Sequence, residues 1–354
     1  MSENLHKIHL TSFQVIILGF AGVILSGALL LMLPWASVKG AVTPFHEALF
    51  TATSAVCVTG LVVQDTGSYW SSFGQAVILI LIQTGGFGVV TVAAAVSMMS
   101  GRKISLMQRS TMQNAISAPK VGGIVRLTKF ILKGTFLIEG MGALLLLPVF
   151  CHDFGWKGIW MAVFHSVSAF CNAGFDILGR EGHLYPSIVG YADNILVNGV
   201  IIGLIIIGGI GFLTWEDICE YKWKFKNYRM QSKLILATTA CLIILPACFF
   251  FFADFQHLPV KSRLLASVFQ SVTPRTAGFN TVDITMMTEA SKVVMILLML
   301  IGGSPGSTAG GMKTTTFAVL LLNAVATFKS QEHAGAFGRR IDDQVIKNAA
   351  TIAM

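Results

Sequence analysis

Charged residues are scarce in this chain. They make up 12% of its 354 residues, whereas soluble globular domains contain roughly 25%. Hydrophobic residues account for 54%, which is too many for a disordered chain. So few charges cannot cover the surface of a water-soluble protein of this size. The composition therefore predicts an all-α polytopic membrane protein.

Cysteine is also sparse, and the usual signatures of enzymes and metal sites are missing. Six Cys in this length exclude a disulfide-rich secreted scaffold, and their spacing fits no metal site. The sequence contains no recognisable Ser/His/Asp set, Walker loop or dinucleotide fingerprint. His165 is better explained as a hydrogen-bond donor in a helix than as a ligand. We expect no enzyme activity, no cofactor bound by this chain and no nucleic-acid partner.

Long runs without Asp, Glu, Lys or Arg divide the chain. A helix needs about 20 apolar residues to cross a bilayer, and each run is long enough. The runs span residues 8–38, 66–101, 194–215, 234–253 and 293–312, and a sixth apolar segment, 124–150, has only Arg126, Lys129, Lys133 and Glu139 as charges. We therefore expect outward and inward helices that alternate through a lipid bilayer.

The basic residues cluster between these runs. One cluster holds Arg102, Lys103, Arg109, Lys120, Arg126, Lys129 and Lys133, the second Lys222, Lys224, Lys226, Arg229 and Lys233, and the third Lys329, Arg339, Arg340 and Lys347. Because Lys and Arg mark cytoplasmic loops, these clusters and the N-terminus, with Lys7, are predicted to be cytoplasmic. The net charge of +8 then reflects orientation in the membrane. The expected location is the plasma (inner) membrane, with several spans.

One structural unit is used three times along the chain. Each copy starts with an outward helix ended by a proline, followed by a short amphipathic stretch, a single glycine, and an inward helix with a glycine pair. The prolines are Pro34, Pro148 and Pro246, the stretches 45–55, 160–169 and 264–273, the single glycines Gly60, Gly174 and Gly278, and the pairs Gly85-Gly86, Gly208-Gly209 and Gly302-Gly303. We interpret the first two pairs as sites of close packing inside continuous helices.

The amphipathic stretch is too short to cross the membrane. Because both of its flanks lie outside by the charge rule, we expect a short helix that enters the membrane and an extended segment that returns. Exposed backbone is tolerated at this depth only where it lines a water-filled path. Glycine lets carbonyls point at an axis, where a carbonyl ring can replace the hydration shell of a potassium ion. A single such glycine could equally be a turn residue, but three matching copies favour a pore.

Three segments carry a family resemblance: residues 54–61 (SAVCVTGL), 168–175 (SAFCNAGF) and 273–280 (TPRTAGFN). They resemble the selectivity filters of the Ktr/Trk/HKT superfamily, and the whole chain is similar to the membrane subunit of Ktr-type potassium uptake systems. The resemblance places these residues in a potassium-binding filter: Cys57, Val58, Thr59, Gly60, Cys171, Asn172, Ala173, Gly174, Thr276, Ala277 and Gly278. Relatives with Ser at the first filter glycine tend to pass sodium, so Gly60 argues for potassium.

The resemblance also implies four helix–pore loop–helix repeats around one pore, a homodimer, and a cytosolic nucleotide-binding regulatory ring that would carry ATP or ADP. Repeat 1 is assigned to residues 12–101, repeat 2 to 102–218 and repeat 3 to 219–330. Residues 331–354 are expected to begin a fourth outward helix, and a fourth filter glycine would fall beyond residue 354. We therefore expect the chain to be a fragment of a four-repeat protein.

The third inward helix is interrupted. Residues 302–313 contain five glycines and a proline, which cannot form a continuous helix. The break falls just below the predicted filter, where a polar loop would act as a gate, and the resembling family has its intramembrane gating loop here. The alternative is a kinked helix packed through small residues. The candidate gate residues are Gly302, Gly303, Ser304, Pro305, Gly306, Ser307, Thr308, Ala309, Gly310, Gly311 and Lys313.

Three charged residues within the predicted membrane region require an explanation. Lys313 would repel cations from the path, or it extends to the membrane surface. Glu139 is its possible counter-ion, or it faces a polar helix interface. Arg275 adjoins the third filter, and we expect it to point behind the filter and to pair with Asp283 or Asp176.

Two classes of function remain open. The leading hypothesis is potassium uptake through a carbonyl-lined filter gated by the glycine-rich loop. The rival is a sodium-coupled or sodium-permeable cation symporter, which would need a midplane site and usually inverted or two-fold repeats. The repeats here all run in one direction, which favours a channel-like pore.

Overall fold

The structure, a computed structural model, describes residues 11–99, 106–116 and 122–353. Lys7, Arg102, Lys103, Lys120 and the predicted boundary between the first two repeats lie outside these ranges. The described helices are α1 Ser12–Leu31, α2 Phe45–Val56, α3 Ser72–Phe87, α4 Val89–Met99, α5 Leu106–Ile116, α6 Ile124–Phe154, α7 Lys157–Phe170, α8 Ile195–Gly209, α9 Phe212–Tyr221, α10 Met230–Ala253, α11 Val260–Val272, α12 Glu289–Leu300, α13 Thr314–Phe328 and α14 Asp343–Ala353, with strands β1 Gly335–Ala336 and β2 Arg339–Arg340.

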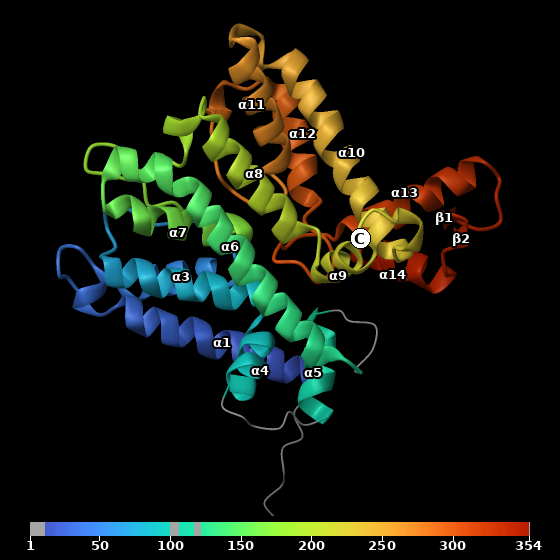
Figure 1. Ribbon diagram of the computed structural model, residues 1–354, viewed down its shortest axis with the longest axis horizontal. Coiled ribbons are helices and arrows are strands. Elements are labelled where there is room, and N and C mark those ends of the chain that lie inside the picture. Colours follow the sequence, from blue (N-terminus) through green and yellow to red (C-terminus); the bar gives the residue numbers. More distant parts are fainter. Residues whose placement is uncertain (1–10, 100–105, 117–121, 354) are drawn as a thin grey trace, which may run out of the picture.

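Among the described residues, three helices are long and apolar enough to cross a membrane, α1, α6 and α10, and the bent pair α8 and α9 could make a fourth span. The first three are the predicted outward helices, and in Figure 1 they diverge from the lower centre and right of the view toward its left and top. The expectation that a proline ends each helix holds only for the first, where α1 stops at Leu31 before Pro34. Pro148 and Pro246 lie inside α6 and α10. A chain can carry a proline within a helix in a membrane protein where neighbouring groups satisfy the freed carbonyl.

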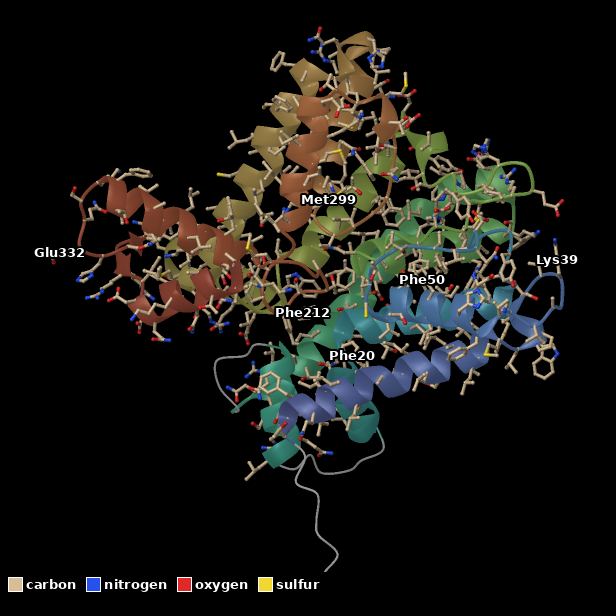
Figure 2. All side chains as sticks on the ribbon, turned by 180° about the vertical axis from the view of Figure 1, so that it is seen from behind. Phe20, Lys39, Phe50, Phe212, Met299 and Glu332 are labelled. Atoms are coloured by element: carbon tan, nitrogen blue, oxygen red, sulfur yellow. The ribbon has the colours of Figure 1, made fainter. Side chains whose placement is uncertain are left out.

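A short helix follows each long one and packs against it: α2 on α1, α7 on α6 and α11 on α10. Their lengths of 12, 14 and 13 residues are too short to span a bilayer, as the sequence predicts. Phe164 and Phe269 are fully buried, whereas Phe50 is 43% exposed and lies near the middle of the view in Figure 2. A buried phenylalanine therefore anchors the second and third short helices.

All three inward helices are broken, and the expectation of continuous first and second inward helices is wrong. The first breaks between α3 and α4 at Gly88, the second bends by 99° between α8 and α9, and the third is interrupted from residue 301 to 313. Gly88 and Gly211 have φ of 79° and 89°, which a glycine adopts without steric cost. At the first two breaks, the chain therefore changes direction through a glycine that lies two residues after the glycine pair.

The glycine pairs themselves do provide close packing. A Cβ atom on Gly85 would collide with the carbonyl oxygen of Val56, and one on Gly208 with that of Phe170. Val56 and Phe170 are the last residues of the short helices α2 and α7. The first and second inward helices therefore contact the C-terminal end of the short helix in their own repeat through a residue that has no side chain.

The last part of the described chain forms an arm to one side of the molecule. It consists of α13, the β1–β2 hairpin and α14, with Glu332 near its tip (Figures 1 and 2). Gly335 pairs with Arg340 and Ala336 with Arg339, and the turn residues Phe337 and Gly338 both have positive φ, as a type I′ turn requires. A small apolar cluster that includes Leu234, Val319 and Ile341 holds the arm to α10.

Candidate ion pathway

The three predicted filter segments share an unusual backbone. Val58, Asn172 and Thr276, at equivalent positions, have φ of 54°, 56° and 68°. Two residues later, φ is again positive at the three single glycines, which are Gly60 (80°), Gly174 (69°) and Gly278 (82°). Positive φ is rare for β-branched residues such as Val and Thr, and it persists only where the surroundings impose it. The structure imposes it three times in the same place.

Backbone N–H groups of these segments bond back to the short helices. Thr59 N donates to Ser54 O at 2.8 Å, Ala173 N to Ser168 O at 2.8 Å, and Gly278 N to Thr273 O at 3.3 Å. Side chains fix the second and third segments further, because Ser168 Oγ donates to Phe175 O at 2.7 Å and Thr273 Oγ1 to Phe279 O at 2.5 Å. Because these N–H groups point into the protein, the backbone carbonyls of the segments are the polar groups that can face an ion path.

The segments also meet one another. A Cβ on Gly60 would collide with the carbonyl oxygen of Ala173, and a Cβ on Gly174 would lie 2.5 Å from that of Ala277 and 3.1 Å from the Cα of Gly278. Along the chain, each of the three glycines is more than 100 residues from the next. The fold therefore brings them side by side with no room for a side chain between neighbours.

Cavities lie on both sides of this junction. One of 140 Å³ is lined by the three single glycines and by residues that follow them, including Asp65, Asp176 and Asn280. The other, of 390 Å³, is lined by Cys57 and Val58, by the glycine pair Gly85-Gly86, and by residues 306–310 of the glycine-rich segment. The junction thus separates a mouth from an inner cavity.

The mouth is acidic. Asp65 accepts from the backbone N–H and the hydroxyl of Ser68 and from the backbone N–H of Tyr185, which pins the loops together. Burial, together with the nearby Asp65 charge, raises the pKa of Asp176 to about 6, although the Leu178 N–H stabilises the carboxylate. Two carboxyl groups beside the junction favour the approach of cations.

The glycine-rich segment folds back on itself beneath the junction. Gly302 N donates to Met312 O at 2.9 Å and Gly303 N to Gly310 O at 3.2 Å, so the two ends of the loop run beside each other. Residues 303 and 304 are buried, as is Thr308. The segment is therefore a compact loop rather than a kinked helix, since α12 ends at Leu300 and α13 begins at Thr314.

This loop docks onto the break in the second inward helix. Ser304 N donates to Gly209 O at 2.9 Å, Thr308 N to Gly208 O at 3.2 Å, and Phe212 N to Gly306 O at 2.7 Å. Thr308 Oγ1 also donates to Phe170 O, at 2.9 Å, at the end of the short helix α7. The unpaired backbone groups at one helix break thus satisfy those at the other, which is how both breaks are tolerated inside a membrane.

Lys313 and Glu139 each bond an uncharged group. Lys313 Nζ donates to Ala309 O at 2.9 Å, and Glu139 accepts from the amide of Gln83 with both oxygens, at 3.0 and 3.1 Å. No ion pair joins Glu139 to Lys313 within the described ranges, so the counter-ion alternative is wrong. Glu139 lies at a polar interface between α6 and α3, as the second alternative states.

Arg275 is 6% exposed, and it is not paired with an acid. In the part of the chain that the structure describes, no carboxylate lies within 4.0 Å of it, and its Nε has no hydrogen-bond partner. The expected partners are bonded elsewhere, because Asp283 accepts from Thr285 and Asp176 from Leu178. Arg275 instead lines a small cavity behind the junction with Asn172, Thr239 and Gly303.

Several residues at this site have no signal in the sequence analysis. Asp65 and Gln83 are single polar residues with no distinguishing pattern, and only the tertiary contacts reveal their positions. Gly88 and Gly211 could have been recognised, because each follows a glycine pair closely and such clusters break helices. His165 Nδ1 lies 2.8 Å from Met161 O, which agrees with the expected hydrogen bond within a short helix.

Comparisons with known proteins agree with one another. A family model described as TrkH, cation transport protein, matches residues 6–354. The potassium/sodium uptake protein NtpJ of Enterococcus hirae is 41% identical over 358 residues, covering 99% of this chain and 78% of NtpJ. Ktr system potassium uptake protein B of Bacillus subtilis is 38% identical over 355 residues, covering 98% of this chain and 78% of that protein.

A solved structure shows the same fold. The potassium transporter TrkH from Vibrio parahaemolyticus superposes with a TM-score of 0.73 at 18% sequence identity, covering 99% of this chain and 70% of that one.

Proposed function

The chain belongs to the TrkH family of cation transport proteins, and from that premise we propose that it takes up potassium ions through the junction of its three filter segments. The observation that carries the proposal is the shared backbone of these segments, with positive φ at Val58, Asn172 and Thr276 and again at the glycine two residues later. Positive φ at alternate residues turns successive carbonyls toward one side. Carbonyls arranged in this way replace the water around a dehydrating cation.

The proposed binding atoms are backbone carbonyl oxygens of the filter segments, and the side chains serve other purposes. Cys171 is 1% exposed and its thiol bonds Gln83 Oε1 at 3.7 Å, away from a carbonyl ring. Gly60 keeps the ring narrow, since no Cβ fits beside the Ala173 carbonyl. A narrow ring of fixed carbonyls discriminates between cations of different radius.

We propose that the glycine-rich loop, residues 302–313, is the gate. It lines the inner cavity directly below the filter, and hydrogen bonds to Gly208, Gly209, Phe212 and Phe170 hold it there. Breaking this small set of bonds would free the loop to move out of the path. Lys313 is the last residue of this loop, so its charge would repel cations while the loop is closed and would move away when the loop opens.

The basic clusters that follow the second inward helix and that lie in the hairpin support a cytoplasmic position for these segments and for the N-terminus. A cytosolic nucleotide-binding ring that carries ATP or ADP would dock there and control a homodimer of this chain in the plasma membrane. A ligand of that ring shifts the gate only through its different affinity for the open and closed states.

Sodium is the second candidate ion. NtpJ is named a potassium/sodium uptake protein, and a sodium-coupled or sodium-permeable symporter of the same family would share this fold. The glycine at position 60, where the segment contacts Ala173, supports potassium.

The test is uptake of potassium and sodium by the full-length protein in cells that lack their own potassium uptake systems. We expect growth and uptake at low potassium concentration, and a higher initial rate for potassium than for sodium. Equal rates for the two ions would overturn the potassium assignment, and no uptake of either ion, with the protein present in the membrane, would overturn the proposed function.

A further inference from the structure

A buried carboxyl group lies behind the second filter segment. Glu139, on α6, is 5% exposed, and the structure pairs it with no Lys, Arg or His among the residues it describes. Burying an unpaired carboxyl costs several kcal/mol unless hydrogen bonds offset the lost water, and such a group inside a membrane usually has a function. The proposed ion pathway does not use it.

Gln83, on α3, joins this carboxyl group to the filter. Its Nε2 donates to both oxygens of Glu139, at 3.0 and 3.1 Å, and its Oε1 accepts from the thiol of Cys171 at 3.7 Å. The donor end of the amide faces an acceptor and the acceptor end faces a donor. The amide therefore has one preferred orientation, and it bridges a transmembrane helix to the residue that precedes the left-handed Asn172.

The surrounding backbone is fitted to this bridge. A Cβ on Gly86, one turn after Gln83 on the same face of α3, would lie 2.7 Å from the sulfur of Cys171. Ser166 Oγ donates to the backbone oxygen of Glu139 at 2.7 Å, which ties α6 to the short helix α7. Cys171 thus sits in a slot formed by two repeats, with Gln83 at its edge.

The equivalent position in the third filter has no such bridge. Arg275, the counterpart of Cys171 there, lines a cavity with Ile206 and Gly209 of α8, which match Gln83 and Gly86 when the glycine pairs are aligned. The geometry of the slot recurs in the third filter, but its polar bridge does not.

We propose that Gln83 is a positioning residue for the second filter segment, anchored by Glu139, and that this bridge sets how strongly the pathway selects potassium over sodium. The inference rests on the proposed function, because selectivity has meaning only if the segment lines the ion path. Its physical basis is that a filter discriminates by the fixed position of its carbonyls, and Cys171 immediately precedes the strained residue that aims them.

The test compares potassium and sodium uptake by the full-length protein and its variants. Gln83→Leu removes both ends of the bridge, and we expect the potassium-to-sodium uptake ratio to fall about tenfold, the effect of losing hydrogen bonds worth little more than one kilocalorie per mole. Cys171→Ala should lower the ratio in the same direction. The double variant should fall no further than Gln83→Leu alone, since both changes break one bridge.

Substitutions at Glu139 distinguish two roles of this residue: a hydrogen-bond acceptor that positions Gln83, and a negative charge near the filter. Glu139→Gln keeps an acceptor for the Gln83 amide and removes any charge, so the ratio should stay within about twofold of the unaltered protein, whereas Glu139→Leu should lower it as Gln83→Leu does. The control is Thr84→Val, because the Thr84 hydroxyl bonds Ile80 O within its own helix. A ratio that falls equally in Glu139→Gln and Glu139→Leu would overturn the positioning role in favour of a charge effect.

Two further outcomes keep the proposal apart from the function on which it rests. If Gln83→Leu and Cys171→Ala both leave the ratio unchanged while Gly60→Ser lowers it, the filter assignment stands and the positioning role is refuted. If the unaltered protein takes up neither ion, the function itself fails. Should Gln83→Leu not reach the membrane, Cys171→Ala and the Glu139 pair decide the matter by the same ratio.

Discussion

A Cβ atom on Gly174 would lie 2.5 Å from the carbonyl oxygen of Ala277, in the next repeat. A separation below 3.0 Å is one that real side chains do not adopt, so the second filter segment tolerates only glycine beside the third. Gly60 stands in the same relationship to Ala173. A side chain at either glycine would therefore displace the carbonyl of the neighbouring filter segment as well as the carbonyl of the glycine itself.

Gly60→Ser should therefore weaken selection of potassium over sodium. The new side chain must move the Ala173 carbonyl or turn the Gly60 peptide away from its positive φ, at a cost of about 1–3 kcal/mol in backbone strain. Either movement changes the arrangement of the filter carbonyls around the ion. The measurement is the ratio of potassium to sodium uptake, with Gly40→Ser as control, because that glycine also has positive φ but a Cβ added there would meet nothing within 4 Å. An unchanged ratio in Gly60→Ser would count against the filter assignment.

Thr308→Val should raise ion flux. Valine has nearly the shape of threonine but cannot donate to Phe170 O, so the loop loses one of its attachments to α7, worth about 1 kcal/mol. We expect a several-fold rise in basal flux and a weaker response to the regulatory partner. Thr327→Val, which removes a hydroxyl bonded within α13, is the matched control. A fall in flux with regulation intact would show that the loop is a packing element.

Deleting Ser304 to Ala309 is the stronger version of the same test. It removes the whole contact with Gly208 and Gly209, and flux should become high and insensitive to the partner and its nucleotide. Lys313→Ala should raise flux less, because it removes a charge that repels cations but leaves the loop. The measurement is the ion flux of the deletion variant, of Lys313→Ala and of the unaltered protein, at equal amounts of folded protein. We expect the flux to decrease in that order. This prediction is refuted if Lys313→Ala exceeds the deletion.

Potassium uptake should weaken as the external pH falls through about 6, where burial and Asp65 place the pKa of Asp176. Protonation below this pH removes one of two negative charges at the mouth and so lowers the local cation concentration. The half-saturating potassium concentration should rise between pH 7 and pH 5. Asp176→Asn should show the high value at both pH values. A steep pH dependence retained in Asp176→Asn would assign the effect to another group.

The basic face should be cytoplasmic. In a background in which the native cysteines are replaced, a cysteine at Lys224 should react with a membrane-impermeant reagent only from inside, and one at Glu181 only from outside. Both side chains are exposed in the structure, so failure to react from either side would reflect the membrane and not burial. The opposite labelling pattern would reverse the topology.

The repeat and its elements can be predicted from the amino-acid sequence alone. Charge-free runs, short amphipathic stretches and single glycines recur in order, and they predict the long helices α1, α6 and α10, the short helices after them, and the three segments that meet at Gly60, Gly174 and Gly278. These features follow from local rules, because the length of an apolar run and the backbone freedom of glycine are properties of a few neighbouring residues.

The partners of the polar residues, in contrast, depend on how the helices pack. Glu139 could bond Lys313 or a neighbouring helix, and Arg275 could pair with either of two acids. The fold placed Gln83 beside Glu139 and left Arg275 without an acid among the residues described. It also broke the second inward helix where the glycine-rich loop docks. Such choices depend on which helices pack side by side, since a buried polar group bonds whatever the fold brings within about 3 Å of it.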